Sequence, residues 1–249
     1  MHMWKTRNLK IFMIITAFSA LLSACTNVLP GAQGADPFEK LNRKTHEFNK
    51  NLDRNFLGPV SSRYSSVLPD PIETSVNNFA SNLRLPGKVA NNILQLDLYA
   101  AAQNTSRFFV NSTVGIAGFF DPSGKLGIAV IETDFGETLE GWGVGEGAYI
   151  ELPLLGPSNL RDSVGRVVDA VLLDPVDYIL VQPEANYRTA ADLSSLLQTR
   201  DALRDQINSL FNESADSYAQ ARLIYLQNRR FKLEDVSSET YFDPYEDFE

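Results

Sequence analysis

The chain has 249 residues, 44% of them hydrophobic and 21% charged, which suits one compact domain or two small ones and excludes a disordered or collagen-like protein. Its formal net charge is -9, and the first 24 residues hold three of the basic groups and no acidic one. This acidic balance excludes nucleic-acid binding through bulk electrostatic attraction, which needs a dense basic surface.

The N-terminal segment has the pattern of an export signal. Basic residues precede an apolar run over residues 11–22, which is too short to cross a bilayer as a helix. The run leads through Leu-Ser-Ala to Cys25, the one cysteine of the chain, and so resembles a bacterial lipoprotein signal. An ordinary secretory signal with a chance cysteine is the alternative. We expect a signal peptide over residues 1–24, an acylated Cys25 and a flexible tether over residues 25–35.

Helical patterns begin directly after the tether. Asp36-Pro37 is typical of a helix start, and apolar residues then recur at steps of three and four. This pattern predicts an amphipathic helix that ends at Leu57-Gly58-Pro59. On this helix His46 lies four residues before Lys50 on a polar face, so we expect a solvated surface histidine and not a catalytic one.

Three more helical patterns follow. Asp70-Pro71 repeats the same start, and Pro86-Gly87 is expected to close that helix. A short pattern covers about residues 86–96, and another helix is expected from Asp97 through Val110.

Two glycine-rich stretches interrupt the helices. Residues 113–120, TVGIAGFF, are apolar, and they predict either a buried turn or a surface that enters lipid. Residues 141–147 alternate glycine with other residues, but a short strand ending at Pro153 follows where a nucleotide site needs a helix. We therefore interpret this second stretch as a hinge or a close backbone approach.

The C-terminal part is expected to be helical up to an acidic tail. A helix is predicted from Ser158 to about Ala170, and residues 187–213 and 216–233 have the pattern of a helical hairpin. Residues 234–249 contain seven acidic groups and no basic one, so they predict a mostly disordered tail. We expect one folded domain over residues 36–233.

The residues that most enzymes use are scarce. Beyond residue 24 there is one cysteine, Cys25, and one histidine, His46, so a zinc site of cysteine and histidine ligands cannot form. The Gly-x-Ser-x-Gly motif of a nucleophile elbow is absent. We expect no enzyme activity, no metal and no cofactor.

Several separated motifs, in order, resemble the VacJ/MlaA lipoproteins. The match covers residues 36–185 and continues weakly to about residue 232. The motifs are Asp36-Pro37, Asn42-Arg43, Phe48-Asn49, Asn78-Phe79, Asn82-Leu83, Arg107-Phe108-Phe109-Val110-Asn111-Ser112-Thr113-Val114-Gly115, Asp134-Phe135-Gly136, Gly143-Val144-Gly145, Leu152-Pro153, Gly156-Pro157-Ser158 and Arg161-Asp162.

The resemblance implies a mainly α fold: a ring-like helical assembly with a short hairpin and a glycine-rich loop, embedded in one leaflet. It implies a channel for mislocalised phospholipid in the outer membrane, with a trimeric porin and a soluble periplasmic lipid carrier as partners, and the outer-membrane inner leaflet as the site. A porin-associated scaffold that moves no lipid is the alternative function.

Two groups of residues are candidates for that role. The density of apolar side chains in a lipid-anchored protein suggests a membrane belt of Phe109, Ile116, Phe119 and Phe120. The second candidate is a hinge at the channel, formed by Gly141, Gly143, Gly145 and Gly147.

Overall fold

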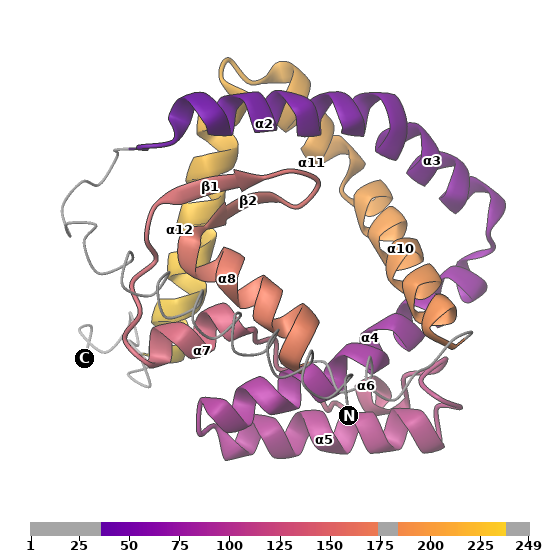
Figure 1. Ribbon diagram of the computed structural model, residues 1–249. Coiled ribbons are helices and arrows are strands. Elements are labelled where there is room, and N and C mark those ends of the chain that lie inside the picture. Colours follow the sequence, from indigo (N-terminus) through magenta and orange to yellow (C-terminus); the bar gives the residue numbers. More distant parts are fainter. Residues whose placement is uncertain (1–35, 174–183, 238–249) are drawn as a thin grey trace, which may run out of the picture. The chain divides into compact units, whose positions relative to one another are not determined.

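The computed structural model describes residues 36–173 and 184–237 (Figure 1). The predicted signal peptide, Cys25, the tether and residues 238–249 of the predicted tail lie outside the described residues. The described residues fall into two compact units, one up to Arg204 and one from Asp205. The predicted extent of the folded domain, residues 36–233, stays a prediction.

The first unit is mainly helical. Its elements are α2 (Glu39–Leu52), the π-helical turn η1 (Asp53–Leu57), α3 (Gly58–Val67), α4 (Asp70–Leu94), α5 (Leu98–Thr113), α6 (Pro122–Lys125), α7 (Phe135–Gly141), β1 (Tyr149–Leu152), β2 (Gly156–Asn159), α8 (Leu160–Val168), η2 (Asp169–Leu173) and α10 (Glu184–Ala202).

The second unit continues from α11 (Arg204–Asn208), which crosses the boundary, through η3 (Ser209–Glu213) to α12 (Ser217–Ser237). The sequence predicted one continuous helix over residues 187–213, whereas the chain divides there into three segments. The last helix extends four residues beyond the predicted end at residue 233.

The elements of the first unit pack in a closed circuit (Figure 1). α2 continues through η1 into α3, α3 packs on α10, and α10 packs on α4. From α4 the contacts lead through α7 to α8, then to β2 and β1, and β1 returns to α2. The prediction of a mainly helical, ring-like arrangement is confirmed for this unit.

The hairpin and several helix starts agree with the sequence. β1 and β2 are antiparallel, with Tyr149 opposite Asn159 and Leu152 opposite Gly156. The side chain of Asp97 caps α5 by accepting a hydrogen bond from the N–H of Ala100 at 2.8 Å. Asp36 behaves differently: α2 begins at Glu39, and Asp36 accepts from the N–H of Phe38.

Two predicted helix ends are wrong, and both contain proline. The chain runs helically through Gly58 and Pro59, because η1 widens the turn and the N–H of Gly58 donates to the carbonyl of Asp53. Pro59 lacks an N–H, and in a regular helix its ring would crowd the carbonyl one turn earlier, so a wider turn accommodates it better. Pro86 lies inside α4, whose packing against α5 and α10 outweighs the local preference to end there.

The apolar core of the first unit is small. Phe135, Leu139 and Val168 form its buried cluster, where α7 meets the end of α8. Most of the largest fully buried side chains are polar, with Asn42, Asn91, Asn92, Asn104 and Asn159 among them. Hydrogen bonds between amides therefore carry much of the packing that apolar contacts provide in most proteins.

Candidate functional site

A stripe of buried and half-buried polar side chains runs along α2 to the first residue of η1. Asn42, His46, Asn49 and Asp53 recur at steps of four and three residues, so they lie on one face of the helix. His46 is only 2% exposed, and its Nδ1 lies 3.3 Å from Oε1 of Glu151 on β1. The expectation of a solvated His46 is wrong, because the polar face of α2 is the one that packs on the hairpin.

This stripe attaches α2 to the hairpin through paired hydrogen bonds. The side-chain amide of Asn42 donates to the carbonyl of Tyr149 at 3.1 Å, and its oxygen accepts from the N–H of Glu151 at 2.9 Å. Asn49 repeats the pattern with the carbonyl of Leu152 at 3.0 Å and the N–H of Leu154 at 2.8 Å. The two amides thus occupy the free backbone edge of β1, as a third strand would.

α5 has the same organisation. Its buried face carries Ala100, Asn104, Arg107 and Asn111, again at steps of four and three. Asn104 is fully buried and donates to Asn92 and to the carbonyl of Ile131, both at 2.9 Å. Its oxygen accepts from the N–H of Ile131 at 3.1 Å. The extended segment before α7 is therefore held to α5 by an amide instead of by apolar packing.

A half-buried carboxylate joins α4, α7 and η2. Asp169 accepts from the side chain of Asn91 at 2.7 Å and from the N–H of Phe135 at 3.0 Å. Burial raises the pKa of Asp169 above its usual value against the effect of these two hydrogen bonds, and the nearby charges of Asp134 and Glu137 add to the rise. Because the folded-state pKa is raised, the stability that Asp169 contributes is greatest at low pH and declines as pH rises through that pKa.

A second carboxylate, Asp121, lies where the apolar 113–120 loop ends. It pairs with Arg107 through both carboxylate oxygens at 2.9 Å, and Asn111 and the N–H of Gly124 also donate to it at 2.9 Å. Burial by itself would raise the pKa of Asp121, but these hydrogen bonds and the charge of Arg107 together lower it. The stabilisation from Asp121 is therefore present above its ordinary pKa and is lost as pH falls through the lower folded-state value.

The four residues of the predicted membrane belt all lie at the surface. Phe109, Ile116 and Phe120 are 61%, 63% and 55% exposed, and Phe119 is 39% exposed with its ring stacked on Phe79. The alternative of a buried turn over residues 113–120 is therefore wrong. The exposed face of α5, which carries Phe109, contains no charged residue.

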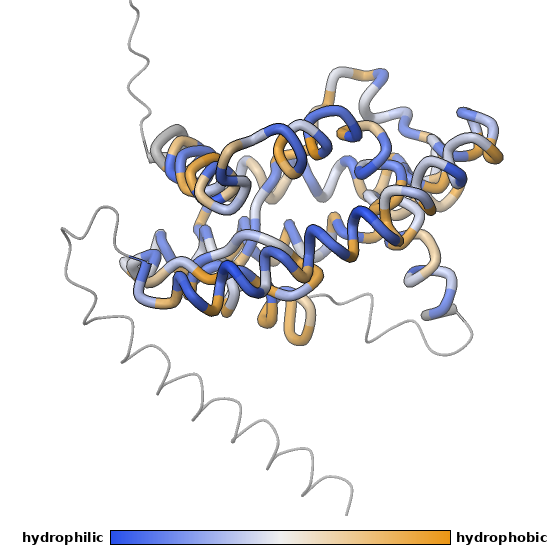
Figure 2. Tube along the Cα trace, turned by 90° about the horizontal axis from the view of Figure 1, so that it is seen from above, coloured by the Kyte–Doolittle hydropathy of each residue, from blue (hydrophilic) through white to orange (hydrophobic). Residues whose placement is uncertain are grey.

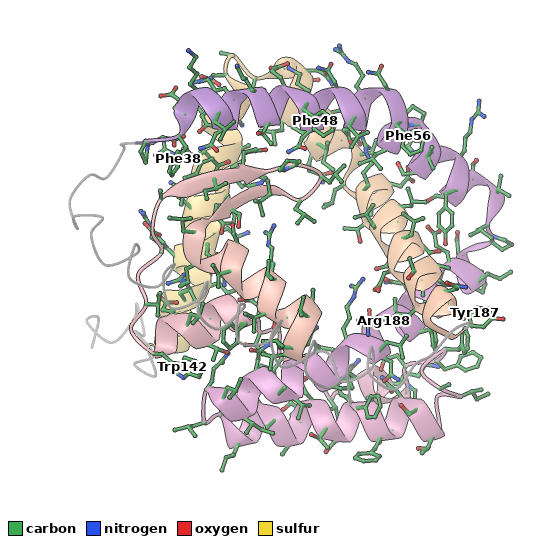
Figure 3. All side chains as sticks on the ribbon, in the orientation of Figure 1. Phe38, Phe48, Phe56, Trp142, Tyr187 and Arg188 are labelled. Atoms are coloured by element: carbon green, nitrogen blue, oxygen red, sulfur yellow. The ribbon has the colours of Figure 1, made fainter. Side chains whose placement is uncertain are left out.

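Exposed apolar side chains extend well beyond the predicted belt. On α2 and η1 they include Leu41, Phe48 and Phe56, and Figure 3 shows Phe38, Phe48 and Phe56 following one another along this part of the chain. In Figure 2 hydrophobic residues recur along the helices and are not gathered in one central layer. At about 100° per residue, the apolar positions of α2 lie roughly a quarter turn from its buried stripe, with the charged positions on the other side.

A further apolar cluster, which we call the α4–α5 tip, was missed by the sequence reasoning. Leu96, Leu98 and Tyr99 are all at least 70% exposed around the turn between these helices. Trp142, at the end of α7, is half-exposed and donates from its indole to the carbonyl of Leu94 at 3.3 Å (Figure 3). The sequence feature that could have predicted this cluster is a short apolar run, Leu96, Leu98 and Tyr99, with Asp97 as its single charged residue.

The predicted hinge glycines link α7 to the hairpin. Gly143 and Gly147 have positive φ angles of 86° and 69°, which favour glycine. A Cβ at Gly147 would lie 2.9 Å from that of Leu160, whereas a Cβ at Gly141, Gly143 or Gly145 would meet nothing within 4 Å. The stretch therefore combines one close approach with three positions in open space.

The described residues contain neither a membrane-spanning helix nor a metal-binding cluster. No helix among them is long and apolar enough to cross a membrane. Within residues 36–173 and 184–237, no group of three histidine, cysteine, aspartate or glutamate residues could hold a metal ion.

Exposed clusters of aromatic and aliphatic side chains, on helices that bury amides and ion pairs, are typical of the class of proteins that contact a membrane or a partner through apolar patches. Comparison with known proteins gives the family: residues 34–232 match the family model described as MlaA lipoprotein. The chain belongs to the MlaA lipoprotein family.

Individual relatives agree with this assignment. The intermembrane phospholipid transport system lipoprotein MlaA of Shigella flexneri is 34% identical over 218 residues, which cover 86% of this chain and 84% of the relative. A protein of Rickettsia bellii is 38% identical over 143 residues, which cover 57% of this chain and 56% of the relative. The chain thus matches a little over half the length of the Rickettsia protein.

A solved structure is also similar. Described as the structural basis for maintenance of bacterial outer membrane lipid asymmetry, it matches with a TM-score of 0.69 and 32% sequence identity. The match covers 80% of this chain and 99% of the solved chain.

Proposed function

We propose that this protein is an outer-membrane lipoprotein, anchored through acyl chains on Cys25, that moves mislocalised phospholipid from the outer leaflet toward the periplasm and so maintains lipid asymmetry. The observation that carries the proposal is the distribution of side chains in the first unit. Its closed circuit of helices buries stripes of amides and exposes clusters of apolar side chains. The MlaA relatives, named for intermembrane phospholipid transport, support the same function.

The physical reason lies in the lipid itself. A phospholipid has a charged head group, which cannot cross the hydrocarbon core of a bilayer without losing its hydration. In this proposal the closed circuit of helices surrounds the head group during its passage, and apolar side chains on its exterior hold the circuit in one leaflet. The buried amides hold the circuit together through hydrogen bonds within the protein. Transport therefore needs no reaction and no bound cofactor, and phospholipid is the transported ligand.

The membrane belt in this proposal is larger than the four residues chosen from the sequence. It includes Phe109, Ile116, Phe119 and Phe120, the apolar side of α2, and the α4–α5 tip. Tyr99 and Trp142 suit the level of the lipid head groups, where amphipathic aromatic rings are favoured. We propose that this belt lies in the inner leaflet of the outer membrane.

Two partners complete the pathway. A trimeric outer-membrane porin would hold the protein at its place in the membrane, and a soluble periplasmic carrier would receive the lipid. The family resemblance supports both partners.

The channel hinge is proposed at Gly141, Gly143, Gly145 and Gly147, and Gly145 gives its sharpest test. Gly145→Pro should reduce lipid export at least tenfold, because proline fixes φ and restricts the preceding residue. Gly145 has no positive φ and a Cβ there meets nothing, so the variant should fold normally. The matched control Gly145→Ala should export lipid as the parent does. Export by Gly145→Pro at the parental rate would refute the hinge.

One experiment separates the conduit from the scaffold that moves no lipid. The protein is purified in mild detergent, and phospholipid that copurifies is quantified by mass spectrometry. A conduit is expected to carry phospholipid above the background of an unrelated lipoprotein prepared in the same way. Phospholipid at background would support the scaffold, and lysophospholipid formed on mixing with vesicles would indicate an enzyme.

A further inference from the structure

Most backbone N–H groups of the 113–120 loop are already hydrogen-bonded within the protein. Val114 and Gly115 donate to the carbonyl of Val110, and Gly118 donates to that of Asn111 at 2.8 Å. The N–H groups of Ala117, Phe119 and Phe120 are likewise paired, with Ser112, Ile116 and Gly115 respectively. Water would satisfy these groups in an ordinary surface loop, whereas a loop that enters hydrocarbon must satisfy them internally.

The loop holds an unusual backbone conformation. Ile116 and Ala117 have φ angles of 51° and 56°, followed by 92° at Gly118. A left-handed conformation is unfavourable for a β-branched residue such as isoleucine, so surrounding contacts must impose it.

Close contacts with α4 and α5 impose this conformation. A Cβ at Gly115 would lie 2.4 Å from the carbonyl oxygens of Asn111 and Phe120, and one at Gly118 would lie 2.5 Å from the Cβ of Asn82. The ring of Phe119 stacks on that of Phe79 with centroids 4.8 Å apart. The loop is therefore a compact body seated on two helices.

Charged and amide groups hold the base of the loop. Asn111 and Asp121 flank it, and both belong to the cluster centred on Arg107, which is 6% exposed. The oxygen of Asn111 also accepts from the N–H of Ser123 at 3.1 Å, and Arg107 donates to the carbonyl of Ile128. We call Arg107, Asn111 and Asp121 the clamp. Residues 113–120, between the two flanking residues, carry no charge.

We propose that the clamp is a positioning device, which preforms the 113–120 loop as a rigid apolar wedge and fixes the depth at which it enters lipid. This inference rests on the proposed membrane contact of the loop. A wedge that is ordered before it meets the membrane loses little conformational freedom on entry, so its apolar side chains contribute fully to binding.

The first experiment tests preformation without lipid. Amide hydrogen exchange is measured on the full chain carrying Cys25→Ala in detergent-free buffer. The N–H groups of Gly118 and Phe120 are expected to exchange at least tenfold more slowly than in the same chain carrying Asp121→Asn. Fast exchange of these groups in the parent would overturn the inference, whatever the protein does at membranes.

The second experiment measures insertion depth. Val114→Cys in the Cys25→Ala chain gives a single thiol for a fluorescent label, and phosphatidylethanolamine–phosphatidylglycerol vesicles carry lipids brominated at defined depths. The parent is expected to show quenching that peaks at one depth, and Asp121→Asn a shallower, broader profile with about tenfold weaker vesicle binding. Asp192→Asn, which removes a charge that pairs with Arg84 and Arg188 away from the loop, should match the parent.

The outcomes separate the two proposals. If the label on the parent is not quenched but its loop amides exchange slowly, the proposed membrane contact is refuted and the loop is still shown to be rigid. Equal depth in the parent and in Asp121→Asn would overturn the clamp. If Asp121→Asn fails to fold, the insertion depth of Gly118→Ala is measured instead. The Cβ of the new alanine would displace the loop from Asn82 without removing a charge. An unchanged depth in that variant would also overturn the inference.

Discussion

Replacing both Phe119 and Phe120 with aspartate, in a chain that carries Cys25→Ala and so lacks the acyl anchor, is expected to lower vesicle binding by a factor of about 100 or more. Burial of each phenylalanine in lipid contributes about 1.5–3 kcal/mol, and every 1.4 kcal/mol corresponds to about tenfold in binding. The new carboxylates would also have to lose their hydration to enter the membrane. Vesicle flotation over a range of lipid concentrations measures the effect.

Charge alone must be separated from position in this experiment. Lys44→Asp changes the net charge by the same amount on the charged, exposed side of α2, and it should bind vesicles nearly as the parent does. Unchanged binding of the double aspartate variant would show that the 113–120 loop is not part of the belt. The apolar side of α2 and the α4–α5 tip would then remain to account for membrane contact.

Breaking the ion pair between Asp53 and Arg200 is expected to give the largest loss of stability. The guanidinium of Arg200 donates to both carboxylate oxygens at 2.9 and 2.7 Å, and the two side chains are only 11% and 9% exposed. The hydrogen bond to Asp53 raises the pKa of Arg200, against the effect of burial. Asp53→Ala leaves a buried charge without this partner and should cost about 3–5 kcal/mol of unfolding free energy.

This pair joins residues 147 positions apart and closes the circuit between η1 and α10. Thermal unfolding by circular dichroism should show a midpoint about 6–20 °C lower for Asp53→Ala. Glu39→Ala, which breaks the exposed pair with Arg43, should cost about 0.5 kcal/mol or less. Asp53→Ala with Arg200→Met should recover part of the loss. Equal midpoints for Asp53→Ala and Glu39→Ala would contradict the importance of this junction.

Local signals predicted much of the fold because they act over a few residues. Asp97 caps α5 as its position indicated, and the strand before Pro153 is β1. The helix ends predicted at Pro59 and Pro86 are wrong, because the structure around each proline, and not the local sequence, determines whether the helix continues. Pro59 follows a π-helical turn that accommodates its ring, and Pro86 lies in a helix flanked by two neighbours. Neither circumstance leaves a mark in the adjacent sequence.

The sequence predicted only part of the candidate site, because it did not show which face of each helix is buried. An amphipathic pattern shows which faces of a helix differ, and the usual rule places the apolar face inward. In α2 the buried face is instead the stripe that contains Asn42 and His46, whose partners lie more than a hundred positions away on β1. The spacing of uncharged polar residues in α2 and α5 was the available signal. The apolar composition of the 113–120 loop left its burial or exposure open, and the clamp depends on contacts between residues that are not adjacent in sequence.

Movement of phospholipid across a bilayer tests the central claim most directly. Vesicles carry the acylated protein on their outer surface and a fluorescent phospholipid only in the lumenal leaflet, with a soluble lipid acceptor outside. The protein should speed the appearance of label on the acceptor at least tenfold over protein-free vesicles, and Gly145→Pro should abolish most of that gain while Gly145→Ala retains it. Label that remains in the lumenal leaflet, at the rate seen without protein, would contradict the account.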